Sequence, residues 1–481
     1  MADISPGIFR EYDIRGRAGT ELTSGTARLI ARAFAGWLEE RLPAAAPRRM
    51  VLGRDNRHSS PELAAGIARG FRESGWEVTD LGVVPTPVFY FARVRYGLDP
   101  GVMVTGSHNE AAYNGFKLAF GPGTLYGEDI REIGCRAAAL EEGRTAGPEA
   151  VEAGVPEAIE ADHRLDPLPD YAADIRERVR LAPRGRPLRV AVDCGSGAAS
   201  VVAPALYGDL GCEIVPLWCE LDADFPGHWP DPVKPENLSE LRRVVRERRA
   251  DVGLAFDGDA DRLGVVDDTG EILWGDVLMI LFWREILPRH PGARAIIEVK
   301  CSQALVDEVR RLGGDPLFYR TGHSLIKAKM RELGALFAGE MSGHLFFADE
   351  YYGFDDAIYA GARLLRILAS ADEPLSTLLA DRPRYFSTPE IRVDCPDETK
   401  FDVVDKVRED FTRAGREVIT VDGARVLFPE GWVLVRASNT QPALVVRCEA
   451  TTEEGLERLK GEVSSVLGRL REESGLEMPD L

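Results

Sequence analysis

The densest group of chemically useful side chains is the acidic segment Asp257-Gly258-Asp259-Ala260-Asp261-Arg262. Its three carboxylates stand at alternate positions directly after an apolar stretch, so they can converge on one ion. Hard divalent cations prefer oxygen ligands, and three carboxylates this close repel one another unless a cation neutralises them. An EF-hand calcium loop does not fit, because Arg262 occupies the position that needs glycine. We therefore predict a metal site at Asp257, Asp259 and Asp261, with a solvated acidic turn as the alternative.

A second polar segment, Thr105-Gly106-Ser107-His108-Asn109, ends another apolar stretch. A serine with a histidine beside it at the end of a strand could be an activated nucleophile. A polar turn in which Ser107 caps a helix explains the same residues equally well. The chain has no Gly-x-Ser-x-Gly motif, which disfavours an acyl-transfer hydrolase. Because a metal beside a serine can neutralise a phosphate held on it, the acidic segment favours phosphoryl chemistry.

Two further polar turns have the composition of ligand-binding loops. The segment Gly339-Glu340-Met341-Ser342-Gly343-His344 contains a carboxylate close to Ser342 and His344. Because a carboxylate can accept hydrogen bonds from two vicinal hydroxyls, this segment could bind a polyol. The segment Arg436-Ala437-Ser438-Asn439-Thr440-Gln441-Pro442 combines one fixed cation with hydroxyls, an amide and backbone N–H groups, as an anion site requires. An ordinary polar turn is the alternative for each.

One glycine-rich turn indicates a different chemistry. The segment Asp193-Cys194-Gly195-Ser196-Gly197 follows a strand and opens a helix, as dinucleotide-binding turns do. The third glycine of that fingerprint is replaced by Ser200, so the match is incomplete. Small residues that let a helix pack closely on a strand explain the turn, and we do not predict a nicotinamide cofactor.

The elements that must position these segments alternate between strand and helix. Ala27, Ile30, Phe34 and Leu38 recur at helical spacing, and short apolar runs between such helices are typical of buried strands. Strands are predicted over Met50–Gly53, Gly101–Thr105, Leu188–Asp193, Glu213–Leu217, Asp251–Phe256, Ala295–Val299, Leu317–Tyr319 and Leu336–Ala338. Helices are predicted over Ala198–Tyr207 and Ser239–Arg248, and from Val277. This alternation predicts mainly parallel sheets covered by helices.

The pattern changes at two places along the chain. Between Leu140 and Asp170 it dissolves into glycine, proline, alanine and acidic residues, which is typical of a linker. After Pro383, strand-like stretches alternate with only two predicted helices, which is typical of an α+β domain.

Composition limits the class of partner. The chain has 481 residues, and 59 Lys+Arg against 79 Asp+Glu give a formal charge of −20, which repels nucleic acid and anionic membranes. The longest apolar run, Val277–Trp283, is far shorter than the ~20 residues of a membrane span, and no basic-then-apolar signal opens the chain. Seven scattered cysteines without a Cys-x-x-Cys pair indicate buried thiols in a reducing compartment. We expect a cytoplasmic protein without nucleic-acid or membrane partners.

The four polar segments, in this order and spread over the whole chain, resemble the α-D-phosphohexomutase superfamily, specifically its bacterial phosphomannomutase/phosphoglucomutase group. Supporting stretches include Gly7–Gly16, Gly53–Arg57, Pro85–Pro87, His228–Pro232, Val299–Ser302 and Thr321–His323. The resemblance implies three related α/β domains with mixed, mainly parallel sheets and a smaller C-terminal α+β domain around a central cleft. We place these domains at residues 1–160, 161–268, 269–380 and 381–481.

The resemblance also implies a role for each matching residue. Ser107 would carry the phosphoryl group and bind Mg²⁺ together with Asp257, Asp259 and Asp261. The reacting end would hold His108, Lys117, Arg262 and His323, with Lys117 as the favoured general acid or base. The substrate would be bound by Tyr12, Arg15, Lys300, Glu340, Ser342 and His344. The non-reacting phosphate would be bound by Arg436, Ser438, Asn439 and Thr440.

The implied activity is an intramolecular phosphotransfer between O1 and O6 of a mannose or glucose phosphate. It would run through a phosphoserine enzyme and a hexose 1,6-bisphosphate that serves as intermediate and activator. The expected partner is a small phosphosugar, and the expected assembly is a monomer or small homo-oligomer. Phosphoglucosamine mutase, a metal-dependent sugar phosphatase and a non-catalytic metal- and sugar-binding module are the alternatives.

Overall fold

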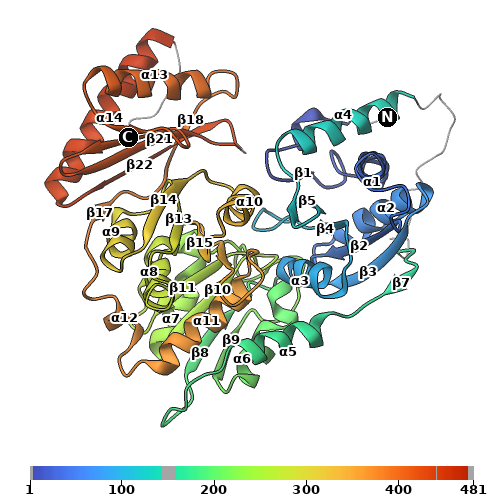
Figure 1. Cartoon of the computed structure of the whole chain (residues 1–481), viewed down its shortest axis with the longest axis horizontal. Coiled ribbons are helices and arrows are strands. Elements are labelled where there is room, and N and C mark those ends of the chain that lie inside the picture. The colour runs from blue at the N-terminus through green and yellow to red at the C-terminus, as the bar shows by residue number, and fades with distance from the viewer. Residues whose placement is uncertain (1–3, 144–158, 440, 475–481) are drawn as a thin grey trace. The chain divides into compact units, whose positions relative to one another are not determined.

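The computed structural model describes residues 4–143, 159–439 and 441–474, which fold into two compact units (Figure 1). Unit 1 comprises Met1–Leu278 and Ser342–Leu378, and unit 2 comprises Met279–Met341 and Leu379–Leu481. Both units combine helices with sheets, and the predicted multidomain α/β fold is confirmed. No helix among the described residues is both long and apolar enough to cross a membrane.

The first sheet of unit 1 positions the serine segment. Its strand order is β1-β5-β4-β2-β3-β7, with β6 paired to β5. Strands β4, β2, β3 and β7 run parallel, whereas β5 is antiparallel to its three partners β1, β4 and β6. The strands are β1 (Ile14–Arg17), β2 (Arg49–Arg54), β3 (Glu77–Val83), β4 (Gly101–Val104), β5 (Tyr113–Phe120), β6 (Gly123–Thr124) and β7 (His163–Arg164). The connection from β4 to β5 therefore carries Ser107, and β5 itself carries Lys117.

Helices cover this sheet in the way that the apolar spacing predicts. They are α1 (Ser24–Glu39), α2 (Ser60–Glu73), α3 (Thr86–Tyr96) and α4 (Glu128–Glu142), with the short η1 (Pro6–Ile8) before β1. Helix α1 begins where the Thr23 side chain accepts a hydrogen bond from the Thr26 backbone N–H, a typical N-cap. Its predicted stripe is fully buried in one apolar core with residues of α2 and the sheet, and that burial fixes the platform behind the site.

The second sheet of unit 1 positions the acidic segment. Its order is β12-β11-β10-β8-β9, in which β10, β8 and β9 are parallel and β11 returns antiparallel to β10. The strands are β8 (Arg189–Asp193), β9 (Glu213–Leu217), β10 (Val252–Phe256), β11 (Leu263–Asp267) and β12 (Ile272–Leu273). Every residue of β10 is buried, as the apolar run predicts for a central strand. The acidic loop is therefore the tight connection between β10 and β11.

The remaining elements of unit 1 lie around this second sheet. They are α5 (Leu168–Arg178), η2 (Ala198–Val201), α6 (Ala203–Asp209), η3 (Pro235–Leu238), α7 (Ser239–Arg248), β16 (Leu345–Phe347), α11 (Ala357–Ser370) and α12 (Leu375–Leu378). The single helix predicted over Ala198–Tyr207 is wrong, because Val202 departs from helical geometry and splits it into η2 and α6. The predicted linker is also too long, because α5 starts at Leu168, with Pro169 tolerated in its first turn. Residues 144–158 of that linker lie outside the described residues.

Unit 2 contains a parallel sheet and an antiparallel one. The parallel strands follow the order β14-β13-β15, and the antiparallel sheet follows β17-β22-β21-β20-β19 with β18 also paired to β22. The strands are β13 (Arg294–Glu298), β14 (Asp315–Tyr319), β15 (Phe337–Gly339), β17 (Phe386–Ser387), β18 (Ile391–Asp394), β19 (Val418–Ile419), β20 (Ala424–Phe428), β21 (Gly431–Ala437) and β22 (Ala443–Ala450). The helices are α8 (Gly275–Ile286), which contains the boundary between the units, α9 (Gln303–Arg311), α10 (His323–Leu333), α13 (Lys400–Arg413) and α14 (Glu453–Ser474). The antiparallel sheet with two helices confirms the α+β character predicted after Pro383.

Candidate active site

Ser107 meets the acidic loop inside unit 1, although 150 positions of sequence separate them. The Ser107 hydroxyl donates a hydrogen bond of 2.8 Å to Asp257 Oδ2 and lies 3.1 Å from His108 Nδ1. Only 3% of the serine is exposed. The fold therefore brings together Ser107 and the acidic loop, a proximity that the sequence implied only through the family resemblance.

The backbone holds this serine in an unusual conformation. Ser107 has a φ of 48°, in the left-handed region that non-glycine residues seldom adopt. The buried Arg57 guanidinium stabilises the turn by donating 2.6 Å hydrogen bonds to the carbonyls of Ser107 and Asn109. A Cβ at Gly106 would stand 2.4 Å from Arg57 Nε, so this approach requires glycine. Such strain held in place by surrounding bonds is common where a side chain must be presented for chemistry.

The three aspartates form one buried group. Their carboxylate oxygens lie within 4.8 Å of one another, and each residue is at most 1% exposed. Burial, followed by the charges of Asp261 and Asp259, raises the pKa of Asp257 well above its ordinary value. Among the described residues, Asp259 Oδ1 is buried and accepts no hydrogen bond. A hard, oxygen-preferring dication such as Mg²⁺ fits this donor set, because it supplies the positive charge that three buried carboxylates need.

Lys117 places a positive charge against two of the three aspartates. Its Nζ lies 2.7 Å from Asp259 Oδ2 and also contacts Asp261 Oδ2. Burial alone would lower the pKa of Lys117, but Asp259 and Asp261 raise it well above the ordinary value. Lys117 is therefore protonated at neutral pH, which favours a role in neutralising charge or donating a proton over a role as a base.

His108 has the opposite titration behaviour. Burial, followed by the charges of Arg262 and Arg15, lowers the pKa of His108 well below its ordinary value. Its imidazole is therefore neutral at neutral pH and can exchange a proton with the Ser107 hydroxyl. Arg15 is held over the same turn, because its Nη1 donates 2.9 Å to Asn109 Oδ1.

Arg262 and His344 complete the cluster in unit 1. The Arg262 backbone N–H donates 3.1 Å to Asp257 Oδ1, and its side-chain Nε donates 3.0 Å to His344 Nε2. Ser342, two residues before His344, is half-buried. The predicted residues Ser107, His108, Lys117, Asp257, Asp259, Asp261, Arg262 and His344 are thus connected through direct contacts. Tyr12 lies on the segment before β1 and is half-buried.

Unit 2 joins the predicted substrate residues through two acids, the buried Glu298 and the half-buried Asp422. Lys300 follows β13, and its Nζ forms a 2.6 Å ion pair with Glu390 and lies 3.5 Å from Glu298. The Lys300 charge is the main reason that the pKa of Glu390 falls to about 2. Glu298 also accepts hydrogen bonds from Thr321 Oγ1 at 2.6 Å and from the Met341 N–H at 3.2 Å. Glu298 therefore ties the lysine to the turns that carry His323 and Glu340.

The second acid, Asp422, links the anion-site segment to the same turns. Asp422 Oδ2 accepts from Arg436 Nε at 3.0 Å and from the Thr321 N–H at 3.1 Å. The neighbouring Gly322 N–H donates 2.7 Å to Glu340 Oε1. The predicted residues Lys300, His323, Glu340 and Arg436 therefore lie around one network, although they come from three distant parts of the sequence.

The loop after Arg436 is held by a lysine at the start of helix α13. Lys400 Nζ donates to the Ser438 and Gln441 carbonyls at 2.5 and 3.1 Å, which fixes the turn around Asn439. Thr440, the fourth residue predicted to bind phosphate, lies outside the described residues. The other two predicted members, Ser438 and Asn439, lie at the carboxyl end of β21 next to Arg436.

Several important residues escaped the sequence reasoning. Glu298 and Asp422 each organise a predicted loop, but neither shows a distinctive local pattern. Arg57 was noted only within the stretch Gly53–Arg57, without a role. Thr86 was noted only as part of a Pro-Thr-Pro turn, yet its hydroxyl donates 2.5 Å to Asp259 Oδ2.

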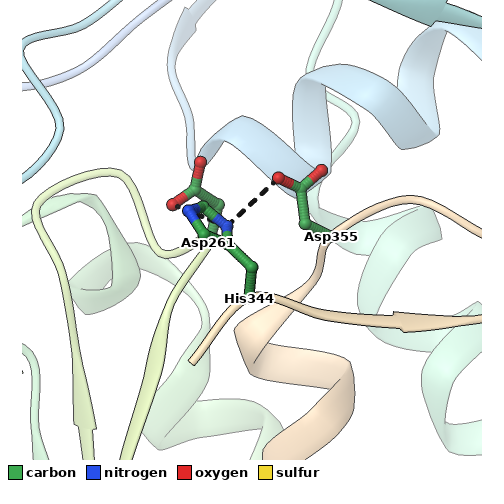
Figure 2. Close-up of side chains that lie close together, drawn as sticks. All are labelled: Asp261, His344 and Asp355. Atoms are coloured by element: carbon green, nitrogen blue, oxygen red, sulfur yellow. Dashed lines mark ion pairs between the residues drawn. The ribbon is translucent and has the colours of Figure 1, made fainter. Parts of the chain in front are cut away.

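Asp355 could have been noticed in the sequence, because it stands beside a second aspartate at the start of a helix. One carboxylate suffices as an N-cap, so the other indicates a different role. In the structure, Asp355 Oδ2 lies 3.3 Å from Nδ1 of His344 (Figure 2).

Comparison with known proteins places the chain among sugar-phosphate mutases. Family models described as phosphoglucomutase/phosphomannomutase, alpha/beta/alpha domains I, II and III and C-terminal domain, match residues 6–143, 169–270, 274–386 and 390–466. The chain is 45% identical over 453 residues, 94% of each chain, to a phosphomannomutase/phosphoglucomutase of Pseudomonas aeruginosa. It is 43% identical over 470 residues, 97% of this chain and 98% of the relative, to a phosphoglucomutase of Neisseria meningitidis serogroup A.

A solved structure agrees with these relatives. The crystal structure of a phosphoglucomutase/phosphomannomutase family protein from Burkholderia thailandensis superposes with a TM-score of 0.88 at 41% identity, covering 99% of this chain and 100% of that one. The matches span all four polar segments and the elements that carry them. The chain therefore belongs to the phosphoglucomutase/phosphomannomutase family of the α-D-phosphohexomutase superfamily and is an enzyme of the mutase class.

Proposed function

We propose that this enzyme interconverts hexose 1-phosphate and hexose 6-phosphate, with mannose and glucose as the sugars. Ser107 carries the phosphoryl group, and a hexose 1,6-bisphosphate is the intermediate and activator. The observation that supports this most directly is the 2.8 Å contact between the Ser107 hydroxyl and Asp257 in a buried group of three carboxylates. The relatives at 43–45% identity are a phosphomannomutase/phosphoglucomutase and a phosphoglucomutase, which favours mannose and glucose over glucosamine.

The cofactor that suits this site is Mg²⁺, held by Asp257, Asp259, Asp261 and an oxygen of the group on Ser107. When bound, the ion would neutralise the charge of the phosphoryl group and of its ligands. The protein supplies the rest of the charge balance through Lys117, which contacts two of the three carboxylates.

The reaction consists of two transfers that use the same residues. In the first, a sugar hydroxyl attacks the phosphorus on phospho-Ser107, the bond to the serine oxygen breaks, and the hydroxyl proton passes to a nearby base. In the second, the serine oxygen attacks the other phosphate of the bisphosphate and the sugar oxygen leaves, taking up a proton. Neutral His108, 3.1 Å from the serine oxygen, is suited to exchange protons there. Phosphoryl transfer otherwise demands positioning and charge neutralisation, which the buried cluster provides.

The residues gathered in unit 2 are suited to hold the part of the substrate that does not react. Glu340 would accept hydrogen bonds from sugar hydroxyls, and Arg436 would pair with the idle phosphate. Ser342, in unit 1, would add a hydroxyl contact, and Tyr12, Arg15, Lys300 and His323 would contribute further substrate contacts. We also propose that Thr440 joins Ser438 and Asn439 in the phosphate site. The division into four domains, the small assembly and the cytoplasmic location stay predictions.

A coupled assay tests the proposal and its alternatives together. Purified enzyme would receive mannose 1-phosphate, glucose 1-phosphate or glucosamine 1-phosphate with Mg²⁺ and a catalytic amount of glucose 1,6-bisphosphate. We expect conversion of the first two to their 6-phosphates without release of inorganic phosphate. Accumulation of inorganic phosphate would indicate a phosphatase, and preference for the amino sugar would indicate phosphoglucosamine mutase.

A further inference from the structure

Arg57 buries a positive charge beside the reacting serine, and the mechanism above gives this charge no task. The residue lies between β2 and α2 and is only 1% exposed. Its Nε donates 3.1 Å to Asp55 Oδ2, and this ion pair offsets the cost of burying the charge. The pair with Asp55 therefore explains how Arg57 can be buried, but not where its remaining N–H groups point.

The other four N–H groups of Arg57 all point at one loop. Nη2 donates to the carbonyls of Ser107 and Asn109 at 2.6 Å each. Nη1 donates to the carbonyls of Glu110 and Tyr113 at 2.7 and 3.1 Å. A guanidinium has five N–H donors, and these contacts together with that of Nε use all of them. No donor is left for a substrate phosphate, so Arg57 can influence the reaction only through this loop.

Asp55 holds the same loop from the other side of Ser107. Its Oδ2 accepts 3.0 Å from the Gly106 N–H, and its Oδ1 accepts 3.1 Å from the Arg57 N–H. The left-handed backbone of Ser107 persists only where its surroundings fix it, and a donor bound to its carbonyl does so. One buried ion pair therefore fixes the serine turn on both sides of the reacting residue.

The Ser107 carbonyl is also the point at which the serine turn meets the acidic loop. A Cβ at Gly258 would clash with this carbonyl oxygen, so the two backbones are in close contact there. A movement of the carbonyl would therefore change how the serine hydroxyl meets Asp257, to which it donates 2.8 Å. Because phosphoryl transfer depends on the alignment of the reacting atoms, such a movement should slow the reaction.

The residue between Asp55 and Arg57 is bound to the other neighbour of the acidic loop. Asn56 Nδ2 donates 2.9 Å to the Ser196 carbonyl, in the glycine-rich turn after β8. The Ala198 N–H that follows this turn donates 2.9 Å to the Gly258 carbonyl. The segment 55–57 is therefore attached both to the serine turn and to a turn that packs against the acidic loop.

We propose that Arg57 is a positioning residue, which sets the reactivity of Ser107 by fixing the carbonyls of its turn. The guanidinium holds the serine backbone in its left-handed conformation and so presents the hydroxyl to Asp257. The alternative is a purely structural role, in which Arg57 stabilises the fold without any specific effect on the transfer step.

This inference rests on the proposed function, and Arg57→Lys tests it. Lysine keeps the positive charge, but its ammonium has three donors on one atom and cannot bind four carbonyls. We expect kcat to fall at least ~10-fold with KM changed less than ~3-fold, because alignment is lost while the substrate-binding residues are unchanged.

The matched control is Arg363→Lys. Arg363 lies on α11, is also fully buried in unit 1, and pairs with Asp349 at 2.9 Å. Its replacement should lower the melting temperature as Arg57→Lys does, yet kcat should stay within ~2-fold of wild type.

Gly106→Ala provides a second route to the same guanidinium without changing Arg57. The added Cβ would stand 2.5 Å from Arg57 Cζ, so the arginine side chain must move away. We expect the same fall in kcat with little change in KM. The double variant Arg57→Lys/Gly106→Ala should lose less activity than the product of the two single losses, because both changes break the same contacts. If Arg57→Lys does not fold, Gly106→Ala alone decides between the two roles.

Hydrogen exchange of the backbone amides separates this proposal from the proposed function, because it needs no substrate. In Arg57→Lys the amides of residues 106–113 should exchange at least ~10-fold faster than in wild type, while those of α1 stay unchanged. A wild type without mutase activity would refute the proposed function, whereas this comparison would still decide whether Arg57 orders the serine turn.

Any of three results would overturn the proposal. One is a kcat within ~2-fold of wild type in both Arg57→Lys and Gly106→Ala. Another is an equal loss of kcat in Arg363→Lys, which would show general damage to the fold. The third is unchanged exchange of residues 106–113 in Arg57→Lys.

Discussion

Ser107 depends on its surroundings for the reactivity that the mechanism assigns to it. A serine hydroxyl is a weak nucleophile at its ordinary pKa, so it needs a partner that removes its proton and charges that stabilise its product. The structure places neutral His108 3.1 Å from the hydroxyl as the proton partner, and Lys117 supplies positive charge at the adjoining acid group. The strained backbone at Ser107 keeps the hydroxyl aimed at that group.

Replacement of Ser107 by alanine should abolish turnover while the fold survives. The change removes one hydroxyl and leaves the Arg57 contacts to the loop carbonyls in place, so the melting temperature should stay within a few degrees. We expect kcat to fall by a factor of at least ~1,000, because no other hydroxyl can carry the phosphoryl group. Normal activity in a correctly folded Ser107→Ala protein would disprove the phosphoserine.

Asp259→Asn should weaken the dependence of activity on Mg²⁺ in a measurable way. The substitution removes one ligand charge from the buried group, so the Mg²⁺ concentration for half-maximal activity should rise at least ~10-fold. Asp267→Asn is a suitable control, because Asp267 is also a buried acid but only accepts hydrogen bonds in the turn after β11. An unchanged metal titration in Asp259→Asn would remove that residue from the metal site.

At the level of helices and strands, the residues proposed to act in the reaction lie mainly at the ends of strands. The β4–β5 and β10–β11 connections bring Ser107 to the aspartates, and β13, β15 and β21 end near Lys300, Glu340 and Arg436. Within unit 2, the pair between Lys300 and Glu390 joins the end of β13 to the residue before β18. Removing one partner of this largely buried pair is destabilising, because the other charge is then left without its counterion.

The Lys300–Glu390 pair gives unit 2 a defined response to acid. The pKa of Glu390 is about 2 in the folded protein and ~4.3 in an unfolded chain. A carboxylate whose pKa is lowered by folding stabilises the fold above pH ~4.3, and this contribution to the unfolding free energy is lost as the pH falls toward 2. The difference in unfolding free energy between wild type and Glu390→Gln should therefore shrink by roughly 1–2 kcal/mol between pH 7 and pH 3.5. Urea unfolding at both pH values measures it, and an equal difference at both would contradict the assignment.

The strands and the polar loops that follow them were predicted well from the sequence, and the reason is physical. A strand buried on both faces must be continuously apolar, as β10 is, and the polar residues after it stand out. Residues whose partners come from distant segments could not be found in this way. Asp422 and Glu298 accept hydrogen bonds from turns that lie more than 20 residues away in sequence, and no local sequence pattern indicates such contacts. The break at Val202 was missed because apolar spacing continues through it.

For the molecule as a whole, the charge balance restricts how an anionic sugar phosphate can be bound. A net charge of −20 repels such a substrate at long range, so buried cations must attract it locally. We propose that Lys117, Lys300 and Arg436, each at most 7% exposed, provide those cations. In the proposed reaction the unit 2 residues bind substrate in both directions, because either phosphate group of the bisphosphate can be the one that does not react.

Arg436→Ala should therefore impair both directions of the reaction alike. A charged hydrogen bond to phosphate contributes ~1.5–3 kcal/mol, so KM should rise ~10- to 100-fold for hexose 1-phosphate and for hexose 6-phosphate. Arg408→Ala is the matched control, since Arg408 forms only a surface pair with Asp405 on α13 and should leave both values unchanged. An effect on one substrate alone would show that Arg436 does not hold the idle phosphate in both poses.

The central claim is that the phosphoryl group passes through Ser107, and peptide mass spectrometry tests it most directly. The enzyme would be loaded with glucose 1,6-bisphosphate and Mg²⁺, digested before and after a chase with hexose 6-phosphate, and mapped for phosphate. We expect phosphate on Ser107 that disappears in the chase as an equal amount of hexose 1,6-bisphosphate forms. Phosphate on another residue, or full turnover with Ser107 never modified, would contradict it.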